Sequence, residues 1–175
     1  MLYMLLALAL RLLLFAYFPA LLTNDSPDYI KAAYDIFTRL AFAGEWLGDV
    51  RMPGYPTFLA LIYPLTGTRS DLLVLAQSAL GLLCVPLGWQ IGRLLHTQRS
   101  ADGLALFFAL NPVYLLLEHA LMTEALSLFL MLAFSAVTLL GLRRAPAAWL
   151  GLLAAVLLGM GALVRVNLLP YSGVL

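Results

Sequence analysis

The stretch "LLVLAQSALGLLCVPLGWQIGRLL", residues 72–95, is apolar along nearly its whole length, and Arg93 is its only charged residue. It is longer than the about 20 residues that an α-helix needs to cross the hydrocarbon core of a bilayer. A helix satisfies its backbone hydrogen bonds internally, as the bilayer core requires. The sequence therefore predicts a membrane-spanning helix at residues 72–95.

The rest of the chain has the same character. Hydrophobic residues make up 63% of the 175 residues and charged residues 11%, whereas a soluble domain has about 45–50% and about 25%. The apolar stretch at residues 103–117 is short for a full span. Pro112 in "NPVY" (111–114) can bend a helix there, which explains the short length. We predict an all-α, polytopic transmembrane bundle, a single domain over residues 1–175, with five membrane helices at about 2–22, 72–95, 103–117, 121–142 and 147–169.

A long loop, residues 23–71, separates the first two predicted membrane helices and holds more than half of the charged residues. Within it, residues 27–43 place apolar side chains on one face of a helix and charged ones elsewhere, which is typical of a helix lying along a membrane interface. Residues 53–67, "PGYPTFLALIYPLTG", are too few to span a bilayer. They predict a second interfacial or re-entrant piece.

Arginines set the expected orientation. Arg93 and Arg99 flank one short loop, and Arg143 and Arg144 lie in another. Because Lys and Arg accumulate in short cytoplasmic loops, both loops are expected in the cytoplasm and the loop 23–71 outside. We predict a multi-pass integral membrane protein, with the bacterial inner (cell) membrane as its location and the lipid bilayer as a partner.

Ionisable residues from distant parts of the chain are expected to meet on the outer face. Asp25 and Asp28 follow the first helix, and Glu124 lies about one turn inside an otherwise apolar helix. Ionisable groups at membrane depth are expensive and are usually functional or paired. With Arg51 and Arg165, they form a candidate site for binding a lipid-linked anion and acting on it, since guanidinium groups match phosphate oxygens.

Each of these residues also has a structural interpretation. Asp25 and Asp28 suit the start of a helix, as a cap and as a first-turn acid, with Ser26 as the other candidate cap. Arg51 and Arg165 are equally explained by structural ion pairs with nearby Asp or Glu residues. Glu124 is explained by a position near the interface, from which its side chain reaches water. Arg11, inside the first helix, is best explained by snorkelling or by packing in the bundle. These alternatives stay open at the level of sequence.

Several function classes have no support. The net charge is +1 and no basic arm is present, which argues against a nucleic-acid partner. The single cysteine, Cys84, allows no intrachain disulfide and is expected to be a small core residue. No nucleotide-binding or serine-hydrolase motif occurs, and Glu118 beside His119 is too little for a metal site. No cofactor is expected and no metal ligands are assigned, while metal dependence stays open. The chain ends while still apolar, which predicts the N-terminal part of a longer protein.

The order of short motifs resembles one enzyme family. These motifs are "DSPDY" (25–29), "RMPGYPTFLAL" (51–61), "NPVYLLLEHALMTEALSLFL" (111–130) and "ALVRVNLL" (162–169). Their order is similar to that of GT-C glycosyltransferases of the ArnT-like and protein O-mannosyltransferase type. The resemblance implies a polyprenyl-phosphate sugar as donor substrate. It also implies catalytic roles for Asp25 and Glu124 and substrate contacts for Arg51, Tyr55 and Arg165.

In the mechanism that the resemblance implies, Asp25 accepts the proton of an acceptor as general base. Arg51 or Arg165 offsets the charge of the departing phosphate. Two other classes compete with an enzyme: a transporter or flippase for a lipid-linked anion, and a non-catalytic membrane scaffold. A transporter is expected to show repeated halves, and no internal repeat is visible in the sequence.

Overall fold

The computed structural model describes residues 2–39, 52–95, 97–143 and 147–165. These residues form helices, and their only other regular feature is an isolated β-bridge between Leu21 and Ala120. The helices are α1 (Leu2–Tyr17), α2 (Ser26–Arg39), α3 (Gly54–Thr66), α4 (Ser70–Leu95), α5 (Gln98–Leu110), α6 (Pro112–His119), α7 (Glu124–Arg143) and α8 (Ala148–Val164).

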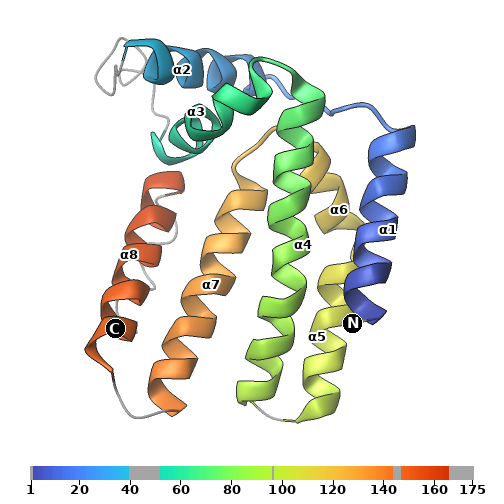
Figure 1. The fold of residues 1–175 in the computed structure, drawn as a ribbon, viewed down its shortest axis with the longest axis vertical. Helices are drawn as coiled ribbons and strands as arrows, with labels where there is room; N and C mark the ends of the chain where they lie inside the picture. The colour runs from blue at the N-terminus through green and yellow to red at the C-terminus, as the bar shows by residue number, and fades with distance from the viewer. Residues whose placement is uncertain (1, 40–51, 96, 144–146, 166–175) are drawn as a thin grey trace.

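The helix α4 is the central element of the bundle. It packs against α5 and α7 most extensively and also contacts α1, α3 and α6, while α8 packs on the far side of α7. The helices α2 and α3 pack on each other and lie across one end of the bundle (Figure 1). The bundle therefore has one end that is covered by the segment between α1 and α4.

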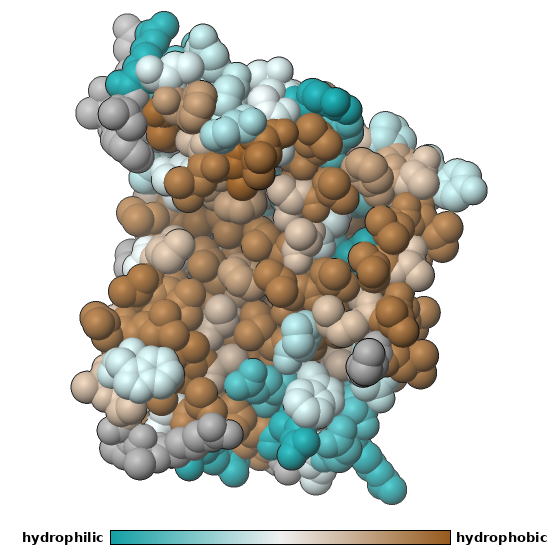
Figure 2. Space-filling view, viewed as in Figure 1, coloured by the Kyte–Doolittle hydropathy of each residue, from teal (hydrophilic) through white to brown (hydrophobic). Residues whose placement is uncertain are grey.

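Within the described ranges, two helices, α4 and α7, are long and apolar enough to cross a membrane. The pair α5 and α6 makes a third if it counts as one span, because its two helices are bent by 45° at a short break. The helices α1 and α8 are apolar but have 16 and 17 residues, or about 24–26 Å of helix. Hydrophobic side chains cover the middle of the molecule, and hydrophilic ones gather toward its two ends (Figure 2). This pattern is that of a membrane protein with two or three candidate spans.

Prolines explain where two of the predicted segments are interrupted. The helix α1 ends at Tyr17 and not near Leu22 as predicted, because the residue before a proline, here Phe18 before Pro19, disfavours helical geometry. The break between α5 and α6 lies at Asn111, whose Oδ1 accepts the N–H groups of Val113 and Tyr114 and so caps α6. The bend predicted at Pro112 is confirmed.

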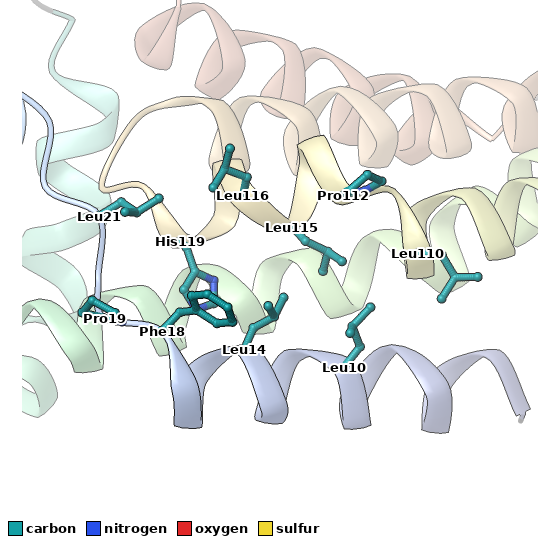
Figure 3. A pocket seen from close by; sticks show the side chains of 10 residues that line it. All are labelled: Leu10, Leu14, Phe18, Pro19, Leu21, Leu110, Pro112, Leu115, Leu116 and His119. Atoms are coloured by element: carbon teal, nitrogen blue, oxygen red, sulfur yellow. The ribbon is translucent and has the colours of Figure 1, made fainter.

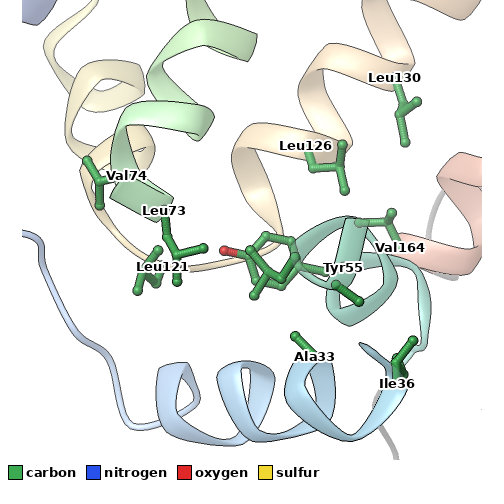
Figure 4. Close-up of a cluster of buried hydrophobic side chains, with 11 residues drawn as sticks. Ala33, Ile36, Tyr55, Leu73, Val74, Leu121, Leu126, Leu130 and Val164 are labelled. Atoms are coloured by element: carbon green, nitrogen blue, oxygen red, sulfur yellow. The ribbon is translucent and has the colours of Figure 1, made fainter. Parts of the chain in front are cut away.

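The largest cluster of buried apolar side chains lies where α2 and α3 meet the bundle (Figure 4). Tyr55 and Leu59 of α3 contribute to it from one side, and Leu73 and Leu126 from the ends of α4 and α7. A second cluster joins α1, α4, α5 and α6 and includes Cys84. The buried position of Cys84 confirms its predicted role as a core residue.

A buried ion pair joins α1 to α6 inside the bundle. Arg11 donates from Nε to Glu118 Oε2 (2.8 Å) and from Nη2 to Glu118 Oε1 (2.5 Å). Arg11 Nη1 also donates to the carbonyl of Ala7 (3.3 Å). Both side chains are buried, so Arg11 packs in the bundle and does not snorkel to the surface. The helix α4 passes so close that a Cβ on Gly81 would overlap the Glu118 carboxylate.

Candidate functional site at the α2–α3 end

The turn between α6 and α7, residues 120–123, is paired with the segment that follows α1. The N–H of Leu21 donates to the carbonyl of His119 (2.9 Å), and the N–H of Leu121 donates to the carbonyl of Leu21 (3.1 Å). Because backbone groups need partners wherever water is scarce, this short pairing fixes two segments that are about 100 residues apart in sequence. It brings the region before Asp25 next to the region before Glu124.

Ser26, the first residue of α2, fastens that helix to the same turn. Its buried Oγ donates to the carbonyl of Leu121 (3.0 Å) and accepts the N–H of Thr23 (2.9 Å). Asp25 occupies the position before the helix, and its carbonyl accepts the N–H of Tyr29 (3.2 Å). By its backbone, Asp25 therefore holds the position that caps α2, and the Ser26 hydroxyl makes the contact with the turn.

Gln77 joins three elements beneath this turn. Its Nε2 donates to the carbonyls of Glu118 (3.0 Å) and Ala120 (2.8 Å), and its Oε1 accepts the hydroxyl of Tyr55. Gln77 is fully buried, so its amide supplies partners that no water would supply there. The amide thereby connects α4, the turn and α3.

Tyr55 lies underneath the site and not on its surface. It is fully buried, and its ring meets that of Tyr29 edge-on with 4.9 Å between the centroids. Burial raises the pKa of the Tyr55 hydroxyl above its ordinary value, and the nearby Tyr29 and Glu124 raise this pKa further. The hydroxyl therefore stays protonated and keeps its hydrogen bond to Gln77.

Glu124 and Arg165 meet at the edge of this end of the bundle. Arg165 Nη1 lies 3.2 Å from Glu124 Oε1, with the side chains 46% and 21% exposed. Arg165 directly follows α8, and a Cβ on Gly54 would lie 2.6 Å from the backbone of Val164, so α3 begins in close contact with the end of α8. An ion pair this exposed contributes about 0–1 kcal/mol. An incoming anion can therefore compete with Glu124 for the guanidinium at small cost.

A pocket of about 500 Å³ adjoins the start of α2. Lys31 and Tyr34 of α2 line one side and Tyr63 of α3 another, with the Tyr34 and Tyr63 rings 6.0 Å apart between centroids. Pro27 also lines the pocket. Because Pro27 is two residues after Asp25 in the chain, the pocket lies close to Asp25. The pocket combines aromatic faces with one cation.

The structure brings together part of the predicted site. Glu124 and Arg165 are in contact. Asp25 precedes α2, and the first residue of α2 bonds to the carbonyl of Leu121, three residues before Glu124. Asp28 lies exposed in the first turn of α2, where the helix dipole favours an acid. Arg51 lies outside the described residues.

Sequence reasoning missed Gln77 and Ser26. A glutamine inside an apolar membrane helix is itself a signal, because its amide needs partners in a medium without water. Ser26 carried a signal too, but that signal pointed to capping.

Within the described parts of the chain, no group of three or more His, Cys, Asp or Glu side chains could hold a metal ion. The site is instead made of carboxylates, one half-exposed guanidinium and a set of hydrogen bonds that position them. Comparison with protein-family models, with curated proteins and with solved structures gives no match.

Proposed function

We propose that the protein is an integral-membrane glycosyltransferase that moves a sugar from a polyprenyl-phosphate donor to an acceptor at the α2–α3 end. The observation that carries the proposal is the half-exposed Glu124–Arg165 pair. Glu124 directly follows the turn to which the start of α2, and with it Asp25, is fastened. A lipid-linked phosphate can replace Glu124 as the partner of the Arg165 guanidinium. The pair lies beside further carboxylates at one end of an apolar bundle, where the headgroup of such a lipid would be.

The charged residues of the site divide the steps of the proposed reaction among them. The acceptor hydroxyl gives its proton to the Asp25 carboxylate while its oxygen forms a bond to the anomeric carbon. The bond between that carbon and the phosphate oxygen breaks, and polyprenyl phosphate leaves with the bonding electrons. Arg165, with Arg51, stabilises the charge that grows on the phosphate. Glu124 orients the acceptor and holds Arg165 before the lipid arrives.

The remaining predicted residues take supporting roles. Asp28, exposed in the first turn of α2, makes only a peripheral contact with the substrate, and the pocket lined by Lys31 and Tyr34 receives part of the donor or the acceptor. Tyr55 acts through position, since its hydroxyl is occupied by Gln77.

Arg165→Ala is expected to weaken binding of a polyprenyl-phosphate sugar by roughly ten- to hundredfold. The reason is that a charged hydrogen bond to phosphate contributes about 1.5–3 kcal/mol. Arg143→Ala serves as the matched control, because Arg143 lies near the opposite end of α7 and donates to the carbonyl of Leu95. Binding is measured by titration of the full-length protein in nanodiscs. An equal loss in both variants would mean that general membrane electrostatics, and not this site, binds the lipid.

We further propose five membrane helices, with α1 and α8 as short spans, α5 and α6 as one broken span, and α2 and α3 at the outer interface. Thr38 of α2 and Gln98 of α5 are both exposed and uncharged, which makes them suitable labelling positions. In intact cells, Thr38→Cys is expected to react with a membrane-impermeant maleimide, and Gln98→Cys only after permeabilisation. The buried Cys84 adds little background. The opposite labelling pattern would invert the topology.

One observation favours the transporter alternative. The 45° break between α5 and α6 gives the bundle a discontinuous helix, and such helices often form the binding sites of transporters. A transporter would bind the lipid through Arg165 but would not need a base. Retention of lipid movement with no sugar transfer, in wild type and Asp25→Asn alike, would favour this alternative.

A further inference from the structure

A second pocket, of about 420 Å³, lies between α1 and the broken pair α5–α6. Of the ten residues that line it, nine are leucine, phenylalanine or proline, and His119 is the tenth (Figure 3). His119 is 5% exposed, and its Nε2 has no hydrogen-bond partner among the described residues. A buried polar atom without a partner costs free energy. The unpaired Nε2 therefore indicates that a ligand atom forms a hydrogen bond with it.

One end of the pocket is apolar, and the other end holds His119, the single polar side chain among the described residues that line it. Leu10 and Leu110 lie at one end, and His119 and Phe18 lie at the other, next to the turn at the α2–α3 end (Figure 3). The eight residues of α1 from Leu10 to Tyr17 cover about 10 Å. This length fits within one leaflet, whose hydrocarbon is about 15 Å thick. The pocket therefore has the shape and polarity of a single lipid chain whose polar end lies near the interface.

The end of the pocket at His119 suits an uncharged group that accepts a hydrogen bond. No arginine or lysine is among the described residues that line it, and the nearby Arg11 is already paired with Glu118. A phosphate would find no cation here. By contrast, Arg165, which pairs with Glu124, directly follows α8, and α8 lies on the opposite side of the bundle from α1 (Figure 1). The pocket and the Glu124–Arg165 pair therefore belong to different sites.

We propose that this pocket binds one ester-linked acyl chain of a membrane glycerophospholipid, and that His119 Nε2–H donates a hydrogen bond to the ester carbonyl. The bound chain fills the space between α1 and α6, so the lipid acts as a structural ligand of the bundle. This inference does not depend on the proposed sugar transfer.

Native mass spectrometry of the full-length protein tests the proposal. The protein is delipidated and then offered a phospholipid with two acyl esters or its diether analogue, which lacks the carbonyls. We expect one diester lipid to be retained about three- to tenfold more tightly than the diether, the usual effect of one hydrogen bond. His119→Phe, which keeps a ring but cannot donate, is expected to remove this difference.

Leu116→Trp supplies a second variant, because Leu116 lines the pocket and is 58% exposed, so a larger side chain is tolerated by the fold. It is expected to abolish retention, whereas Leu152→Trp on the exposed face of α8 is not. Equal retention by wild type and Leu116→Trp would overturn the proposal. Equal retention of diester and diether by wild type, or displacement of the phospholipid by polyprenyl phosphate, would overturn it as well.

Discussion

Replacing Arg11 with leucine is expected to destabilise the protein by about 3–5 kcal/mol, because the change leaves the Glu118 carboxylate buried without its partner. The pair makes two hydrogen bonds and lies inside the bundle, where neither group reaches water. For a protein of this size, the loss corresponds to a fall in melting temperature of about 6–20 °C. Thermal unfolding in detergent, followed by circular dichroism and by reaction of the buried Cys84 with a thiol dye, measures it.

Two further variants separate the ion pair from the loss of an arginine as such. Arg99→Leu removes an exposed arginine from α5 and is expected to change the melting temperature little. The double variant Arg11→Leu with Glu118→Leu should recover most of the lost stability, since apolar replacements of buried ion pairs are often neutral or stabilising. A double variant as unstable as Arg11→Leu alone would show that packing of the guanidinium, and not the unpaired charge, sets the cost.

Asp25→Asn is expected to lower sugar transfer by the full-length protein by about 10²–10⁴, the range found for a positioned acid–base group. Asparagine has nearly the same shape and caps a helix as well as aspartate does, so α2 should still begin at Ser26. The amide cannot accept the proton of the acceptor. Turnover is measured with a polyprenyl-phosphate sugar in nanodiscs, together with the melting temperature, which should stay near that of wild type.

Asp28→Asn is the matched control for this prediction. Asp28 lies in the first turn of the same helix and is more exposed than Asp25. Its interaction with the helix dipole contributes about 0.3–1 kcal/mol, so its replacement should lower turnover much less. Similar turnover in wild type and Asp25→Asn would remove the general base from the mechanism, and with it the main reason to assign catalysis to this end.

The elements with strong local signals were predictable from the sequence. The apolar face of residues 27–43 predicted α2, and prolines and glycines predicted the limits of α3. The start of α4 and the end of α7 were predicted within two residues, because long apolar stretches have few alternatives in a membrane. The end of α1 was predicted too late, since the apolar residues after Pro19 continue the hydrophobic pattern but not the helix.

Contacts between distant residues were not predictable in the same way. Arg11 and Glu118 are separated by 107 positions, and neither position carries a local mark of the other. Gln77 and Ser26 bond mainly to backbone groups, which every residue possesses. The expectation that carboxylates and arginines gather at one end of the bundle rests on topology. Glu124 and Arg165 are in contact at the α2–α3 end.

Release of polyprenyl phosphate distinguishes a glycosyltransferase from a lipid-binding or lipid-moving protein. The full-length protein is reconstituted in liposomes with a polyprenyl-phosphate sugar and candidate acceptors, and the lipid products are followed by mass spectrometry. Our account predicts that wild type releases free polyprenyl phosphate and forms a glycosylated acceptor, while Asp25→Asn binds the donor but releases almost none. Recovery of the donor intact from wild type, either merely bound or moved to the other leaflet, would contradict a glycosyltransferase.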